Sequence, residues 1–220
     1  MSEKRSRKLS RREIAVAIVL IAIVGISCGV HSLVKSYKAE QRELFYDSVK
    51  ESFSMNETIR LDSQVDESDV MPYSSVPASA GLPWEGVVDI AIKRAELYPS
   101  VDSAGLADSA YLSQPEGASF LLLEVEISNI DAEGEYEREA TGEKVFNITF
   151  LKVPPYGDIP YFDGAFDDAT PHEAYCFELP KGESLLLHVG FFVPDNGGPY
   201  TAFLGTTGKY SVPLDVEEKG

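Results

Sequence analysis

Cysteine is scarce in this chain of 220 residues, which has only Cys28 and Cys176. Cys28 lies within an apolar N-terminal segment, so the rest of the chain carries one thiol and can form no internal disulfide. Secreted eukaryotic domains of this size are usually cross-linked by disulfides, and the lack of bridges therefore favours a bacterial cell surface. We expect Cys176 to be a small buried apolar residue rather than a nucleophile.

Catalytic motifs are also missing. The chain has no Gly-x-Ser-x-Gly elbow, no phosphate-binding loop and no dinucleotide fingerprint. Its histidines are His31, His172 and His188; His172 begins a His-Glu-x-x-Cys run in which Cys176 stands where a zinc helix motif needs histidine. The alternation around His188 predicts a half-exposed strand residue. We therefore expect that the protein is not an enzyme and that it has no catalytic residue and no cofactor.

Basic residues are few outside the N-terminus. Six of the 19 Lys and Arg but only two of the 36 Asp and Glu precede residue 14, so 13 basic and 34 acidic residues follow, a formal charge of −21. An acidic body of this kind repels nucleic acid and anionic lipid headgroups. The basic tail, residues 1–13, instead indicates membrane topology.

Residues 14–34 form an uncharged run of 21 residues, IAVAIVLIAIVGISCGVHSLV. As a helix this run is about 30 Å long, which matches the apolar thickness of a bilayer. Six basic residues precede the run, so the positive-inside rule places the N-terminus in the cytoplasm and the C-terminal domain outside the cell. We predict a single-pass signal-anchor, with the lipid bilayer as its partner.

Two alternatives concern how this segment is processed. Gly25-Ile26-Ser27-Cys28 resembles a lipobox with Gly where Leu is usual, so Cys28 is a candidate for lipidation after cleavage. Ser10 to Ile14 also partly matches a twin-arginine export signal. Both alternatives place the same domain on the same side of the membrane.

Two tethers follow the anchor. Apolar residues in 35–53 recur at helical spacing, which predicts a juxtamembrane helix; a short dimerising coiled coil is the alternative, although fewer than three heptads are present. Residues 54–83 are rich in Ser, Asp, Glu and Pro, and this composition predicts a flexible linker. Asn56-Glu57-Thr58 in this segment and Asn147-Ile148-Thr149 further on match the N-glycosylation pattern, which carries no meaning on a bacterial protein.

Short alternating apolar runs between Gly, Pro and Asp clusters fill residues 84–216, and residues 217–220 are left as a tail. This pattern predicts an all-β domain, an antiparallel β-sandwich of about seven strands. Pro213 has no main-chain N–H to donate, which predicts that the last strand lies at a sheet edge. The expected strands centre on Val88–Ile92, Leu121–Ile127, Phe146–Phe150, Tyr175–Phe177, Leu185–Val193, Tyr200–Leu204 and Tyr210–Leu214.

Turn and core residues of this domain carry a family resemblance. Asn129 ends one strand, Pro180, Gly182 and Glu183 form a turn, and the next strand ends in Phe192-Val193-Pro194. Residues 85–216 thereby resemble a bacterial immunoglobulin-like family of unassigned function, found in Gram-positive surface lipoproteins and membrane-anchored proteins. The resemblance implies fold and cell-surface location, and it transfers no site residue. A Glu-rich insertion, between Asn129 and Val145, departs from the family pattern; we expect a solvated hairpin tip there.

One acidic loop is a candidate ion site. Four aspartates alternate with aromatic residues between 158 and 168, and oxygen ligands on a loop are what Ca²⁺ requires. Their spacing is not that of an EF-hand, and a solvated loop with packed aromatics is the competing interpretation. The candidate calcium ligands are Asp158, Asp163, Asp167 and Asp168.

The sequence predicts a non-catalytic, membrane-anchored extracellular module that binds a surface protein or a cell-wall ligand through its loops. The alternative is a calcium-binding protein, or an accessory subunit of a membrane transport, secretion or cell-wall machine. Gly25 and Gly29, a pair that permits close helix contact, favour the accessory subunit.

Overall fold

The computed structural model describes residues 49, 51–66, 82–106, 112–138, 141–154, 159–164, 175–196, 198–205 and 209–220. The chain divides into two compact units, Met1–Leu44 and Phe45–Gly220, and all described residues belong to the second unit. The predicted anchor, residues 14–34, and the tail, residues 1–13, therefore lie outside the described residues, as does Cys28. Among the residues that are described, no helix is long and apolar enough to cross a membrane.

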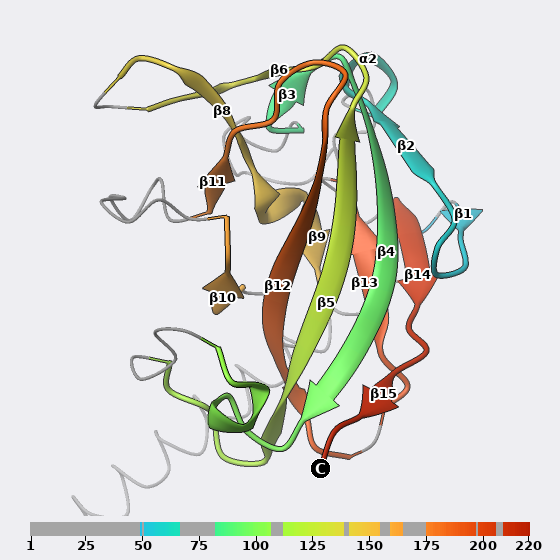
Figure 1. The fold of residues 1–220 in the computed structure, drawn as a ribbon. Helices are drawn as coiled ribbons and strands as arrows, with labels where there is room; N and C mark the ends of the chain where they lie inside the picture. The colour runs from blue at the N-terminus through green and yellow to red at the C-terminus, as the bar shows by residue number, and fades with distance from the viewer. Residues whose placement is uncertain are drawn as a thin grey trace, which may run out of the picture. The chain divides into compact units, whose positions relative to one another are not determined.

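The second unit is an all-β, sandwich-like domain (Figure 1). Three long antiparallel strands dominate its first sheet, and three short strands extend it. Alternating apolar residues form the long strands because every second side chain points to the same face. The sheet has the order β10 (Tyr161–Phe162), β12 (Ser184–Pro194), β5 (Ala118–Asn129), β4 (Val87–Tyr98) and β15 (Glu217–Glu218), with β2 (Ile59–Asp62) also paired to β4.

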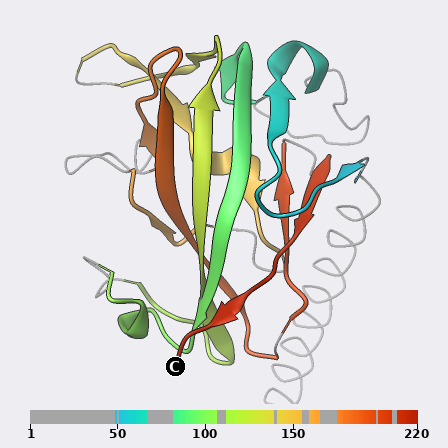
Figure 2. The ribbon, with the colours of Figure 1, turned by 45° about the vertical axis from the view of Figure 1, so that its right-hand side comes forward.

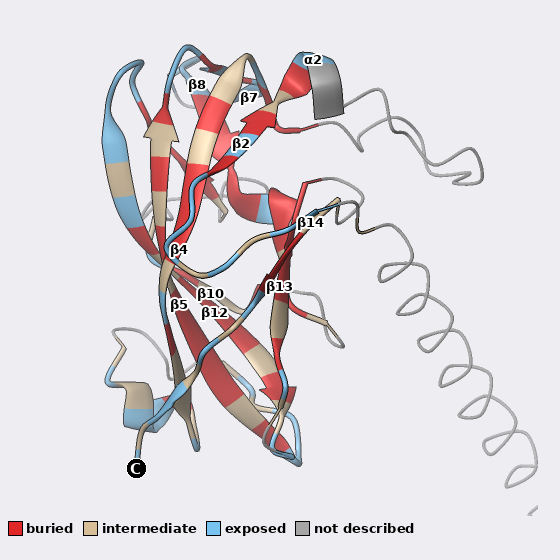
Figure 3. Ribbon diagram, turned by 90° about the vertical axis from the view of Figure 1, so that its right-hand side faces the viewer, coloured by how far each residue is buried: buried red, intermediate tan, exposed pale blue. Residues whose placement is uncertain are grey.

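A second sheet lies across the core from the long strands (Figure 3). The core between the two sheets contains the fully buried Leu123, Val125 and Phe191 from the first sheet and Ala202 and Leu204 from the second. Two smaller strand groups complete the domain. The second sheet has the order β1 (Glu51–Ser52), β14 (Tyr210–Pro213), β13 (Thr201–Leu204) and β9 (Leu151–Lys152). One smaller group has the order β11 (Cys176–Phe177), β8 (Lys144–Asn147) and β7 (Tyr136–Glu137). The other is the pair β3 (Trp84–Glu85) and β6 (Glu133–Gly134).

Most predicted strands are confirmed, but the one expected over 146–150 is not continuous. β8 ends at Asn147, and the 3₁₀-helix η4 (Ile148–Phe150) follows before β9 begins in another sheet. The side chain of Asn147 accepts a hydrogen bond from the main-chain N–H of Thr149 over 2.9 Å, which caps this turn. Ile148 and Phe150 remain buried, so their apolar character serves the core without a strand.

The predicted linker, residues 54–83, is partly wrong. Ile59 to Asp62 form β2, which pairs antiparallel with Val87 to Ile90 of β4, and Ile59 and Leu61 are almost completely buried. The short helix α2 (Ser63–Asp66) follows directly. Two apolar side chains at a spacing of two are enough for a strand when a neighbouring sheet edge supplies the hydrogen bonds.

The domain extends beyond its predicted boundaries at both ends. Glu51 and Ser52, expected in a helix, form β1 and pair in parallel with β14, whereas residues 35–48 and 50 of that predicted helix lie outside the described part. Glu217 and Glu218, expected in a tail, pair in parallel with β4 as β15. These two pairs also make the sandwich not purely antiparallel.

β14 is an interior strand of its sheet rather than the expected edge, because β1 pairs with it. β1 covers only Tyr210 and Ser211, however, so Pro213 pairs with β13 on one side alone. A residue without a main-chain N–H is tolerated at such a position. The expected hairpin of the Glu-rich insertion is confirmed, because Tyr136 and Glu137 pair antiparallel with Val145 and Lys144.

Candidate binding groove and carboxylate–histidine cluster

Both ends of the domain cross from the second sheet to the first at the same edge. The chain leaves β1, passes through residues 53–58 and enters β2; at the other end it leaves β14, passes through residues 214–216 and enters β15. Figure 2 shows β2 and β15 beside different parts of β4. The main-chain N–H of Asp215 donates to the Met55 sulfur over 3.1 Å, so the two crossings contact one another.

The edge of β4 is uncovered between these crossings. β2 pairs with β4 up to Ile90, the N–H of Asn56 donates to the carbonyl of Ile92, and β15 begins opposite Glu96. From Lys93 to Ala95, no strand in the described part of the chain pairs with this edge. The pairing of β4 with β5 also shifts between Ile92 and Arg94, which marks a β-bulge.

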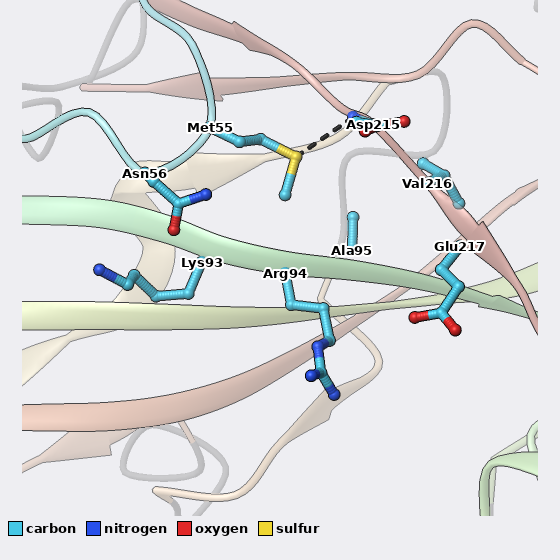
Figure 4. A pocket seen from close by; sticks show the side chains of 8 residues that line it. All are labelled: Met55, Asn56, Lys93, Arg94, Ala95, Asp215, Val216 and Glu217. Carbon is cyan, nitrogen blue, oxygen red and sulfur yellow. Dashed lines mark hydrogen bonds between the residues drawn. The ribbon is translucent and has the colours of Figure 1, made fainter.

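A groove of about 460 Å³ lies over this uncovered stretch (Figure 4). Its floor is Ala95 on β4, and its walls come from the two crossings. Lys93 and Arg94 diverge from β4, while Met55 points across to the main chain of Asp215. We call this the β4 groove; it is lined by Met55, Asn56, Lys93, Arg94, Ala95, Asp215, Val216 and Glu217.

Charged side chains around the groove form partly exposed ion pairs. The Lys93 ammonium lies 3.3 Å from a Glu126 oxygen, and the Arg94 guanidinium lies 3.3 Å from Glu96. Lys219 bridges Glu96 and Glu217 at 3.1 and 2.7 Å. The groove therefore presents both signs of charge, in contrast to the strongly acidic protein as a whole.

Glu96 is the most enclosed carboxylate of this network, with 14% of its side chain exposed. Burial alone would raise its pKa, but the Tyr98 hydroxyl, which donates over 2.8 Å, and the charges of Lys219 and Arg94 outweigh burial and lower the pKa below its ordinary value. Burial and the neighbouring Glu96 carboxylate correspondingly raise the pKa of Tyr98.

A second cluster lies on the outer face of the first sheet. His188 on β12 stands opposite Glu124 on β5, and Asp163 follows β10. The carboxylate of Asp163 accepts from the His188 main-chain N–H over 2.8 Å and contacts Nδ1 over 2.7 Å. Nε2 lies 3.8 Å from a Glu124 oxygen. His188 is 41% exposed, so the predicted half-exposed strand residue is confirmed.

The predicted calcium candidates are only partly described. Both carboxylate oxygens of Asp163 are engaged with His188, whereas Asp158, Asp167 and Asp168 lie outside the described residues. In the described ranges, no group of three or more His, Cys, Asp or Glu side chains is placed to hold a metal ion. Cys176 is fully buried and unbridged, as expected, and the Asn147 amide donates to its sulfur over 3.5 Å.

Sequence reasoning did not find the groove. Its walls come from residues expected in a linker and next to a tail, and its floor lies in the middle of a predicted strand. One signal was present: the inward residues change from Val88, Ile90 and Ile92 to Ala95 and Leu97, with Lys93-Arg94 at the change. Such a shift of parity is the mark of a β-bulge.

Comparison with protein-family models, with curated proteins and with solved structures gives no match.

Proposed function

We propose that the chain is a membrane-anchored, non-catalytic binding module that captures an extended segment of a partner protein in the β4 groove. Residues 14–34 anchor it, and an immunoglobulin-like sandwich outside the cell carries the groove. The observation that supports this proposal is the uncovered stretch of β4 between β2 and β15.

An extended peptide suits this place because strand edges bind other strands through main-chain hydrogen bonds. Three uncovered residues correspond to about 10 Å of strand. The existing neighbours pair with β4 in opposite directions, β2 antiparallel and β15 parallel, so this edge accepts either direction. The groove volume is also within the range of ligand sites in proteins.

The lining favours binding over chemistry. It contains aliphatic side chains, one amide and two residues of each charge, and no serine, cysteine or histidine among its eight residues. Lys93 and Arg94 would contact acidic side chains of the partner segment, and Asp215 and Glu217 would contact basic ones. The partner segment is therefore expected to carry charges of both signs around a short extended core.

The binding test uses a photoreactive amino acid at Glu217, on the groove, compared with one at Lys181, an exposed residue in the turn before β12. In cells producing the full chain, we expect position 217 to form an adduct with one partner, at a single peptide segment. The same adduct should be lost in Lys93→Glu/Arg94→Glu. Adducts that form equally from both positions, or that survive the double substitution, would contradict the groove as the binding site.

Topology is tested separately by thiol labelling of intact cells. In a Cys28→Ser background, a Glu218→Cys variant should react with a membrane-impermeant maleimide, while Ser6→Cys should react only after lysis. Reaction of Ser6→Cys in intact cells would reverse the orientation and overturn the extracellular assignment.

A further inference from the structure

The carboxylate of Asp163 holds the imidazole of His188 in one orientation. It accepts from the main-chain N–H of His188 and contacts Nδ1, and the N–H of Asp163 donates to the carbonyl of His188 over 3.3 Å. A carboxylate can only accept, so Nδ1 carries a hydrogen. The other ring nitrogen, Nε2, is therefore the one available to contact solvent and Glu124.

This arrangement is one in which proteins prepare a histidine to bind a metal ion. A metal-binding histidine usually donates its other N–H to a carboxylate, which fixes the ring and makes the free nitrogen more basic. Here Asp163 would be the carboxylate that accepts from the ring, and His188 would be the residue that binds the ion. Because Asp163 is bound twice to the same residue, the ring keeps its orientation without help from a ligand.

The distance between Nε2 and Glu124 also fits an ion. At 3.8 Å it is too long for a hydrogen bond. A tetrahedral ion bound at about 2.1 Å to each atom requires a separation of roughly 3.4 Å. A shift of about 0.4 Å in the partly exposed carboxylate would close the difference, well within the freedom of a glutamate side chain.

The surroundings allow water to complete the coordination. Glu124 is 28% exposed and His188 is 41% exposed, so solvent reaches the gap between them. Arg94 stands opposite Glu124 on β4, but its guanidinium is engaged with Glu96. Two protein ligands make a weaker site than the three or four of catalytic and structural zinc centres.

We propose that His188 and Glu124 bind a divalent cation of the zinc class on the outer face of the first sheet, with Asp163 as the positioning residue. Imidazole and carboxylate together favour Zn²⁺ over Ca²⁺, which prefers oxygen ligands alone. The site is separate from the β4 groove and stands whether or not the groove binds a peptide.

The test is a titration of the full chain in detergent micelles with Zn²⁺ alone. Binding is measured by calorimetry and by the ¹⁵N resonances of the imidazole rings. We expect the Nε2 resonance of His188 to shift and saturate. Glu124→Gln and Asp163→Asn should each weaken binding by about 10-fold or more, and His188→Gln should abolish it. Glu126→Gln, which changes a carboxylate on the same strand and face, and His172→Gln serve as controls and should leave affinity unchanged.

Several outcomes would overturn the site. One is a His188 resonance that does not move at about 1 mM Zn²⁺; another is an affinity that Glu124→Gln leaves unaltered. A response that His172→Gln removes would place the ion elsewhere. Thermal melting without metal shows whether each variant folds. If His188→Gln does not fold, the response of the His188 resonance in the wild-type protein still tests whether the site binds Zn²⁺.

Discussion

The side-chain amide of Asn129 donates to the main-chain carbonyl of Leu179, 50 residues further along the chain, over 2.7 Å. The same amide donates to the carbonyl of Ala132 over 3.1 Å and accepts from the N–H of Ala132 over 2.7 Å. The main chain of Asn129 bonds to Gly182 and Glu183. One buried residue thus joins the end of β5 to the turn that leads into β12.

Asn129→Asp is expected to destabilise the domain by about 3 kcal/mol, because it replaces a donor between two carbonyl oxygens with a buried carboxylate. Urea unfolding followed by the fluorescence of Trp84, the only tryptophan and fully buried, measures the change. The matched control is Asn56→Asp, an exposed position with a positive φ of 68° that Asp tolerates as Asn does. Equal effects of the two substitutions would refute the structural role of Asn129.

Gly190→Ala should destabilise the domain by about 1–3 kcal/mol, because an added methyl would overlap the Phe120 ring and lie 2.9 Å from Cβ of Tyr161. The double variant with Phe120→Leu should recover part of the loss, since a smaller side chain leaves room. Gly134→Ala should cost more than Gly190→Ala, because its methyl would meet the main chain of Val145. Thermal melting ranks the three variants, and no recovery in the double variant would count against the predicted contact.

Glu96 should make stability depend on pH. Because its pKa is lower in the folded protein than in the unfolded chain, its contribution is complete above the ordinary value of 4.5 and is lost as the pH falls through the folded value. Glu96→Gln should therefore lose stability at pH 7 and show a shallower decline toward acid. Urea unfolding at pH 7 and pH 4 tests this, with Glu218→Gln as the exposed control. Parallel pH profiles for Glu96→Gln and the wild type would contradict the role given to Glu96.

The thiol of Cys176 should resist modification in the folded protein, because the residue is fully buried. In a Cys28→Ser variant, Ellman's reagent should report close to no reactive thiol before denaturation and one afterwards. Rapid reaction under native conditions would show that β11 opens readily, and exchange at that strand would then need to be measured.

The long strands were predictable from the sequence because apolar residues alternate over much of their 11 or 12 residues. Leu121, Leu123, Val125 and Ile127 alternate so regularly that one sheet face is specified without tertiary information. The turn at Gly182, whose φ is 78°, was equally clear from its residue types. Short strands such as β1, β2 and β15 lacked this signal, since two to four residues do not define a period.

The two candidate sites depend on contacts that no local pattern encodes. Met55 and Asp215 lie 160 residues apart. Met55 fell in the predicted linker, and Asp215 fell at the end of the predicted domain, just before the predicted tail. His188 was correctly placed on a half-exposed face, but its pairing with Asp163 depends on how β10 packs beside β12. Strand register, rather than residue type, decides which carboxylate reaches the imidazole.

The two crossings also tie the layers of the sandwich together. β1 belongs to the second sheet and β2 to the first, so the N-terminal side of the domain is paired to both layers within about a dozen residues. β14 and β15 divide the opposite end in the same way. The two sheets are therefore joined to one another by the main chain at both ends of the domain, in addition to the apolar core between them.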